Sequence, residues 1–263
     1  MPRPGWKSVP VAMADRLVSP IVSRGFDRVL VRAPNLIDPM VSMGFAKDKI
    51  SVTQSGVRDD FFAPGNGEEF RSKHGLDGEF VLYLGRLNPT KGLRYLVEAA
   101  PRVVGENPDT RFVLIGPDEG GHRSELEARI RALGLGENFV FLGPIYDQAQ
   151  KRAALSACDV FVLPSGYEGT SQAVMQAMAQ GAAVVTTTVG GMPFLIDHGF
   201  DGILIPFAST QHLSDSLNHL LAHPGHRRRM GERARKRASR QFRYSKLAAR
   251  LSKIYETVNQ ASR

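Results

Sequence analysis

The first residues with binding chemistry are two cations, Arg86 and Lys91, in the loop Gly85–Gly92. A guanidinium can hold phosphate oxygens through two parallel hydrogen bonds, and an ammonium adds a point charge. Backbone N–H groups at the start of a following helix would add further donors, so the loop suits a diphosphate. It is not a Walker loop, and the chain contains no GxGxxG motif. Taken alone, the pattern is more typical of a surface loop than of a binding site.

A carboxylate and a pair of glycines lie in two later loops. Glu168 precedes a helical pattern that runs to Gly181, and a carboxylate beside a helix N-terminus can hold a hydroxyl-rich ligand next to an anionic group. Gly190 and Gly191 let the backbone approach a ligand closely and present its N–H groups. A simple turn explains these two glycines equally well.

An alternation of apolar runs and helical patterns between residues 79 and 206 must position these loops. Strands are expected at residues 80–84, 111–115, 138–142, 159–165, 182–186 and 203–205. Helices are expected at residues 90–105 with Thr90 as N-cap, at 124–133, at 147–157 with Asp147 as N-cap, and up to Gly181. This order predicts an α/β fold, a Rossmann-like parallel sheet with helices on both faces. Ligands bind at the carboxyl ends of the strands in such folds, so the three loops should lie at one edge.

The two ends of the chain follow different patterns. Residues 9–23 look helical, residues 27–32 and 48–53 look like strands, and residues 60–65 read as a linker. After Ser209 the sequence predicts three helices and no strand.

Composition indicates a globular protein, because 42% of the 263 residues are hydrophobic and 23% are charged. No apolar run is long enough for a transmembrane helix, and the first residues lack the apolar core of a signal peptide. The single cysteine, Cys158, cannot form an internal disulfide and fits a small buried residue. We therefore expect a cytoplasmic protein.

The C-terminal part is strongly basic. The net charge is +8, and residues 225–263 contain 13 Lys and Arg against 2 Asp and Glu. The run His226–Arg237 could contact an anionic membrane surface, which would place the protein peripherally at the inner membrane face. A solvated helix face is the more ordinary interpretation. Nucleic acid is not an expected partner, because no aromatic residues interleave with these charges.

Together, these segments resemble glycosyltransferase family 4, the retaining enzymes built from two Rossmann-like domains. The resemblance extends from about Asp27 to the C-terminus and rests on the order and spacing of short motifs. The motifs are Gly85-Arg86 with Lys91-Gly92, Phe112–Gly116, Phe141–Gly143, Ala157–Ser165, Glu168-Gly169, Gly190–Pro193 and Asp201–Pro206. The segments Ser55–Val57 and Phe62–Pro64 are similar to the family's hinge between its domains.

The resemblance implies transfer of a sugar, with retention, from a nucleotide-diphosphate sugar to a saccharide or lipid-linked acceptor. Arg86 and Lys91 would hold the diphosphate and stabilise charge on the leaving group, and Glu168 would contact the sugar hydroxyls. Other implied donor-binding residues are Gly85, Gly116, Pro117, Gly143, Ile145, Thr170, Ser171, Gln176, Gly190 and Gly191. Neither a catalytic metal nor another cofactor is implied, because the two cations would do that work.

Several residues depart from the family pattern. Gln176 stands where a carboxylate usually bonds the ribose, although an amide can still bond hydroxyls. Phe194 replaces a frequent glutamate, and Ser55 replaces a usual asparagine. A nucleotide-sugar-binding or regulatory subunit without catalysis is therefore an alternative, as is a basic-tailed membrane adaptor. A sugar phosphorylase or a nucleotide-sugar epimerase would share the architecture. Phosphorylases of this architecture use a pyridoxal phosphate lysine, and the sequence contains no motif for one.

The resemblance also implies a division of the chain. We expect residues 1–63 to be the end of an N-terminal acceptor domain with its hinge, and residues 64–240 to be the nucleotide-sugar-binding domain, the C-terminal half of the two-domain GT-B architecture. Residues 241–263 would form a crossover helix. Its apolar face comprises Phe242, Tyr244, Leu247, Leu251, Ile254, Tyr255 and Val258.

With a reduced acceptor domain, that face predicts an exposed apolar patch and hence an acceptor-domain partner chain or self-association. Light scattering over a wide concentration range checks the second case. A monodisperse monomer at every concentration would argue against association of the chain with itself.

Overall fold

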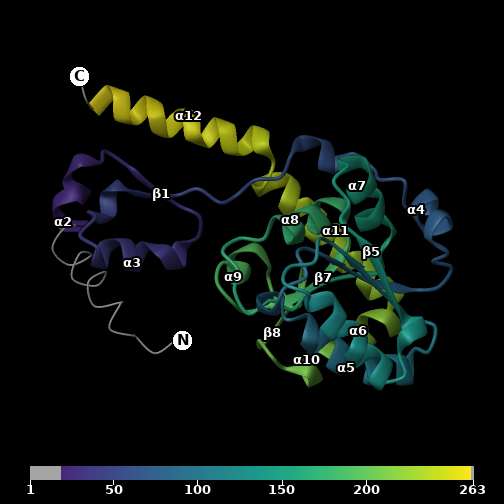
Figure 1. Cartoon of the computed structure of the whole chain (residues 1–263). Helices are drawn as coiled ribbons and strands as arrows, with labels where there is room; N and C mark the ends of the chain where they lie inside the picture. Colours follow the sequence, from purple (N-terminus) through teal and green to yellow (C-terminus); the bar gives the residue numbers. More distant parts are fainter. Residues whose placement is uncertain (1–18, 262–263) are drawn as a thin grey trace, which may run out of the picture. The chain divides into compact units, whose positions relative to one another are not determined.

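The computed structural model describes residues 19–261 and contains two units, each with its own sheet (Figure 1). The described residues up to Ser55 and from Leu247 onward form unit 1, and Gly56–Lys246 form unit 2. The division after Ser55 falls within the segment that resembles a hinge. The expected domain boundaries at residues 63 and 240 stay predictions.

Unit 2 contains six parallel strands in the order β5-β4-β3-β6-β7-β8. Their bounds are β3 (Phe80–Leu84), β4 (Arg111–Ile115), β5 (Phe139–Gly143), β6 (Val160–Leu163), β7 (Ala183–Thr187) and β8 (Ile203–Ile205). All six predicted strands are present, with ends shifted by at most two residues. Every residue of β3, β6 and β7 is buried, as parallel strands covered on both faces require.

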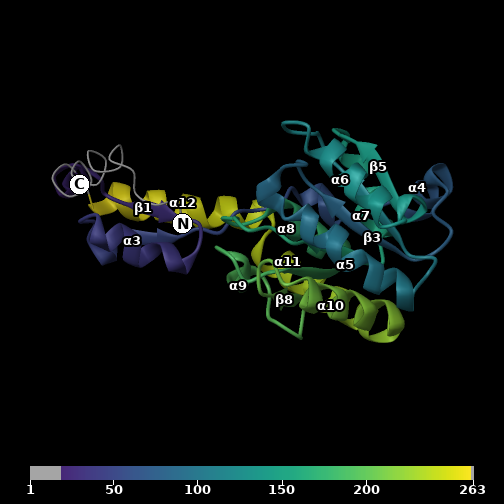
Figure 2. The ribbon, with the colours of Figure 1, turned by 60° about the horizontal axis from the view of Figure 1, so that its bottom comes forward.

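Helices form two groups around this sheet. They are α4 (Gly67–His74), α5 (Leu93–Glu106), α6 (His122–Ala132), α7 (Gln148–Ala157), α8 (Gln172–Gln180), α9 (Met192–Leu195), α10 (Thr210–Ala222) and α11 (Pro224–Gln241). Helix α5 packs on α6 and α10, whereas α8 packs on α7 and α11, and α4 packs on α7. Figure 2 shows α5 beside α10, with the strands between helices. The predicted α/β fold, with a parallel sheet flanked by helices, is thus confirmed.

The start of α5 differs from the prediction. Thr90 does not cap this helix, because it belongs to a separate 3-10 turn, η6 (Pro89–Lys91), which the side chain of Asn88 closes by accepting from Thr90 N at 3.1 Å. Gly92 follows with a φ of +69°, and a Cβ there would lie 2.1 Å from the carbonyl oxygen of Pro164. Only glycine fits this position, so the cation loop packs directly on the loop after β6. The predicted cap of α7 is confirmed, since Asp147 accepts from Gln150 N at 2.7 Å.

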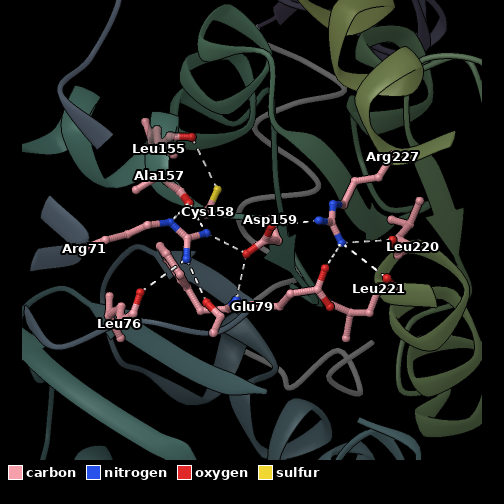
Figure 3. Close-up of polar contacts among 12 residues, drawn as sticks. Arg71, Leu76, Glu79, Leu155, Ala157, Cys158, Asp159, Leu220, Leu221 and Arg227 are labelled. Carbon is pink, nitrogen blue, oxygen red and sulfur yellow. Dashed lines mark hydrogen bonds and ion pairs between the residues drawn. The ribbon is translucent and has the colours of Figure 1, made fainter. Parts of the chain in front are cut away.

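A half-buried carboxylate joins two helices to the amino ends of two strands (Figure 3). Asp159 directly precedes β6, and its Oδ2 accepts from Arg71 of α4 at 2.7 Å and from Phe80 N of β3 at 2.9 Å. Its Oδ1 accepts from Arg227 of α11 at 2.8 Å, and Arg227 also pairs with Glu79 at 2.6 Å. Every charge in this cluster therefore has a partner of opposite sign, as burial demands.

The neighbouring thiol belongs to the same region of the sheet. Cys158 is half-buried, and its Sγ donates to the carbonyl oxygen of Leu155 at 3.3 Å (Figure 3). Burial, followed by the negative charge of Asp159, raises the pKa of this thiol well above its ordinary value.

The basic run on α11 is partly internal, which corrects its interpretation as a solvated face. Besides Arg227, Arg235 donates to the carbonyl oxygen of Phe62 at 2.7 Å, and Arg237 pairs with the buried carboxylate of Asp201 at 3.2 Å. These arginines recur on the side of α11 that faces the body of unit 2. The exposed cations of the run and the following turn are Arg228, Arg229, Lys236 and Arg240.

The predicted linker at residues 60–65 is instead packed. Residues Asp59–Phe62 form a 3-10 turn, η5, in which Phe61 and Phe62 are buried. The amide of Gln180 donates to the carbonyl oxygens of Phe61 and Ala63, the latter at 2.9 Å. Two large aromatic side chains explain this difference, because they enter the core rather than solvent.

Unit 1 is small. It contains α2 (Ser19–Val22), η2 (Ser23–Gly25), β1 (Val29–Val31), η3 (Pro34–Leu36), α3 (Ile37–Ser42), η4 (Lys47–Lys49), β2 (Ile50–Val52) and the part of α12 (Tyr244–Ala261) from Leu247 onward. The strands predicted at residues 27–32 and 48–53 are present as β1 and β2, and the two pair in parallel. Of the helix predicted at residues 9–23, residues 9–18 lie outside the described residues.

The apolar face of α12 is less exposed than expected. Leu247, Leu251, Ile254 and Val258 are half-buried, whereas Tyr244 and Tyr255 are exposed. Within residues 19–261, no helix combines the length and the apolar character needed to cross a membrane.

Replacing Asp159 by asparagine tests the half-buried ion cluster. Asp159→Asn leaves Arg71 without its negative partner and Arg227 with Glu79 alone, so the free energy of unfolding should fall by about 2–4 kcal/mol. Urea unfolding measures this loss. Asp215→Asn removes an exposed pair with Arg102 and should cost under about 1 kcal/mol. Equal losses in both variants would contradict a special role for Asp159.

Candidate functional site

The site lies where the strand order reverses. Chain order runs outward from β3 to β4 and β5 on one side, and from β6 to β7 and β8 on the other. Such a reversal opens a crevice at the carboxyl ends of the two central strands. The loops after β3 and β6 meet there, since Gly166 N donates to the carbonyl oxygen of Thr90 at 2.9 Å.

Lys91 and Glu168 form an ion pair across this crevice. Lys91 Nζ lies 2.7 Å from Glu168 Oε1, and the two side chains are only 17% and 10% exposed. Ser165, which the sequence analysis missed, donates to the same carboxylate oxygen at 2.9 Å. Its only sequence signal is a hydroxyl at a strand end, three residues before Glu168. The group can bind hydroxyls through the carboxylate and an anion through the ammonium.

Arg86 lies at the outer side of the crevice. Its Nη1 is 2.8 Å from Glu119 Oε1, and Asn88 Nδ2 donates to Glu119 Oε2 at 2.7 Å. The hydrogen bond from Asn88, followed by that from Arg86, lowers the pKa of Glu119, which is therefore ionised at neutral pH. Burial raises the pKa of the Tyr83 phenol far above its ordinary value. The phenol is therefore neutral, and it donates to the carbonyl oxygen of Arg86 at 2.7 Å. Neither Glu119 nor Asn88 was predicted as a site residue from the sequence.

A cavity of about 300 Å³ opens beside Arg86, the size of a small ligand pocket. Six predicted residues line it: Gly85, Arg86, Gly116, Pro117, Ile145 and Gln176. The other lining residues are Leu84, Ile115, Pro144, Tyr146, Lys151, Gln172 and Ala173. The lining is mostly apolar with a few amide and cationic groups, and it suits a flat ring system with a polar substituent.

The two glycines after β7 support the loop of Glu168. Gly190 has a φ of +56°, and a Cβ there would lie 1.6 Å from the carbonyl oxygen of Glu168. Gly191 N donates to the carbonyl oxygen of Gly169 at 2.7 Å. The glycine pair therefore allows two loop backbones to touch, and neither glycine lines the cavity beside Arg86.

Three other predicted residues hold structure around the site. Ser171 is buried, and its hydroxyl caps α8 by accepting from Val174 N at 3.4 Å. Thr170 is half-buried beside Gly191. Gly143 ends β5 with a φ of +69°, and its carbonyl oxygen accepts from Gly116 N at 2.9 Å.

Charge in the site comes from the cations Arg86 and Lys91, from the carboxylates Glu119 and Glu168, and from Lys151 in the lining of the cavity. Within the part of the chain that the structure describes, no group of three or more His, Cys, Asp or Glu side chains is arranged to hold a metal ion.

Comparison with known proteins identifies relatives over most of the chain. The family model described as "Glycosyl transferases group 1" matches residues 66–237. The alpha-D-kanosaminyltransferase of Streptomyces kanamyceticus is 31% identical over 72% of this chain and 49% of its own length. The D-inositol 3-phosphate glycosyltransferase of Mycobacteroides abscessus is 31% identical over 76% of this chain and 45% of its own length. The chain thus spans about half the length of the curated relatives it matches.

Solved structures share the fold. HepE of Anabaena in complex with UDP superimposes with a TM-score of 0.85 and 22% identity, covering 93% of this chain and 68% of that chain. The C-terminal domain of LpcC, a glycosyl transferase group 1 family protein from Francisella tularensis, gives a TM-score of 0.66 at 26% identity. That match covers 72% of this chain and 100% of the LpcC domain.

Gly190→Ala tests the close contact between the glycine turn and Glu168. A methyl group in that space must displace the Glu168 backbone, so the free energy of unfolding should fall by about 2–4 kcal/mol in urea titrations. Gly199→Ala is the matched control, because Gly199 has a φ of +78° with nothing within 4 Å of a Cβ. It should cost about 1–2 kcal/mol. Equal losses would show that the contact with Glu168 is unimportant.

Proposed function

Because the chain belongs to the glycosyl transferases group 1, we propose that its site binds a nucleotide-diphosphate sugar as the donor for sugar transfer. One observation carries this proposal: the loop after β3 supplies both Arg86, which lines the cavity, and Lys91, which pairs with Glu168 from the loop after β6. The cavity accepts the nucleoside, the cations face the diphosphate, and the carboxylate receives the sugar hydroxyls. The structures of HepE in complex with UDP and with UDP-glucose support this class of ligand.

Charge development explains why two cations are useful. When the bond between the sugar and the diphosphate breaks, its electron pair stays on the diphosphate oxygen, and the leaving group gains a negative charge. Arg86 and Lys91, fixed on a rigid loop by Asn88 and Gly92, would stabilise that charge without reorganising. We propose that the reaction proceeds with retention, as in glycosyltransferase family 4, and needs neither a metal nor another cofactor.

Donor binding and turnover are separate proposals. Gln176 lines the cavity with a neutral amide. Its amide oxygen can accept hydrogen bonds from ribose hydroxyls, and its amide nitrogen can donate to them. We propose a saccharide or a lipid-linked saccharide as the acceptor. The alternative of a donor-binding subunit predicts binding without transfer or donor hydrolysis.

Contact with an anionic membrane would depend on the four exposed cations at Arg228, Arg229, Lys236 and Arg240.

Calorimetric titration of the full chain with UDP and GDP tests donor binding. Arg86→Ala should weaken binding of the preferred nucleotide by about 10- to 100-fold, because it removes charge-assisted hydrogen bonds to phosphate. Arg129→Ala is the control, since it removes an exposed guanidinium paired with Glu98 outside the site, and it should leave affinity unchanged. The absence of binding by the folded wild-type chain would contradict the proposal.

A further inference from the structure

Glu119 has no role in the proposed site, yet it is bonded to the cation that faces the cavity. Its Oε1 lies 2.8 Å from Nη1 of Arg86, and its Oε2 accepts from Nδ2 of Asn88 at 2.7 Å. The loop that carries the two cations therefore engages both oxygens of this carboxylate.

The backbone keeps Glu119 in this place. Glu119 N donates to the carbonyl oxygen of Leu87 at 3.0 Å, and Leu87 N donates to that of Pro117 at 2.8 Å. The two loops also touch at Gly116, where a Cβ would lie 1.8 Å from the carbonyl oxygen of Gly85. The carboxylate can change rotamer, but its backbone cannot withdraw from Arg86 while these contacts persist.

The two ion pairs of the site differ in exposure. The side chains of Lys91 and Glu168 are 17% and 10% exposed, whereas those of Arg86 and Glu119 are 60% and 40% exposed. An exposed ion pair is held weakly, because water and salt compete for both partners. The Arg86–Glu119 pair is therefore the one in which an anionic ligand can replace the carboxylate.

We propose that Glu119 is a counter-ion that competes with the diphosphate of the ligand for Arg86, and so limits how tightly the site holds phosphate-bearing nucleotides. This inference rests on the proposed function of the site. A bound diphosphate takes guanidinium N–H donors that Glu119 holds in the described structure. Glu119 regains them when the nucleotide leaves.

Product release gives this competition a purpose. Cleavage of the bond between sugar and diphosphate leaves a nucleoside diphosphate with one more negative charge than the donor carried. Two unopposed cations would hold this product more strongly than the donor, since attraction grows with charge. A carboxylate that reclaims Arg86 opposes this effect and favours release, a step that often limits turnover.

Glu119→Gln tests the proposal, because it removes the charge and keeps the size of the side chain. In calorimetric titrations of the full chain, this variant should bind UDP about three- to tenfold more tightly than wild type. Binding of uridine, which has no phosphate, should not change. Glu119→Ala removes the carboxylate by a second route and should give the same gain for UDP alone.

Glu98→Gln is the matched control, because Glu98 forms an ion pair of similar exposure with Arg129 outside the site; its UDP affinity should equal that of wild type. Unchanged or weaker UDP binding by both Glu119 variants would overturn the proposal, provided that wild type binds UDP. An equal gain for uridine would also overturn it. If the folded wild-type chain binds no nucleotide, the proposed function fails, and this inference fails with it.

Discussion

The ion cluster around Asp159 is the constraint on which the site depends. One carboxylate joins the amino ends of β3 and β6, through Phe80 N and its own position before Val160, and attaches α4 and α11 through Arg71 and Arg227. Because parallel strands run in the same direction, fixing their starts also fixes where their carboxyl ends emerge. The cation loop and the Glu168 loop leave the sheet at those ends, so charges at one edge determine the geometry of the other.

Glycine contacts then set the loops against one another. A Cβ at Gly92 would collide with Pro164, one at Gly116 with Gly85, and one at Gly190 with Glu168. Each collision would involve a backbone carbonyl oxygen, which cannot rotate away as a side chain can. The loops after four strands are thereby placed by backbone contact, and the charged side chains inherit their positions from it.

Sequence periodicity was sufficient to locate the strands of the sheet, because β3, β6 and β7 are buried along their full length and are mostly apolar. It also found Arg86, Lys91 and Glu168, which lie directly after such runs. It could not find Glu119 as the partner of Arg86 and Asn88, since pairing over 33 and 31 residues leaves no local pattern. The basic run was interpreted as a solvated helix face for the same reason, because the partners of Arg227 lie 68 and 148 residues away along the chain.

Cys158 gives the molecule a chemical reporter at its structural anchor. It is the only cysteine in the sequence and directly precedes Asp159. Thiol reagents attack the thiolate, which the raised pKa makes scarce while this edge of the sheet is closed. Opening of the edge restores an ordinary thiol, so the rate of labelling reports how often the region around the ion cluster opens. The rate of labelling of Cys158 thus reports motions at the amino ends of β3 and β6 that would disturb the site.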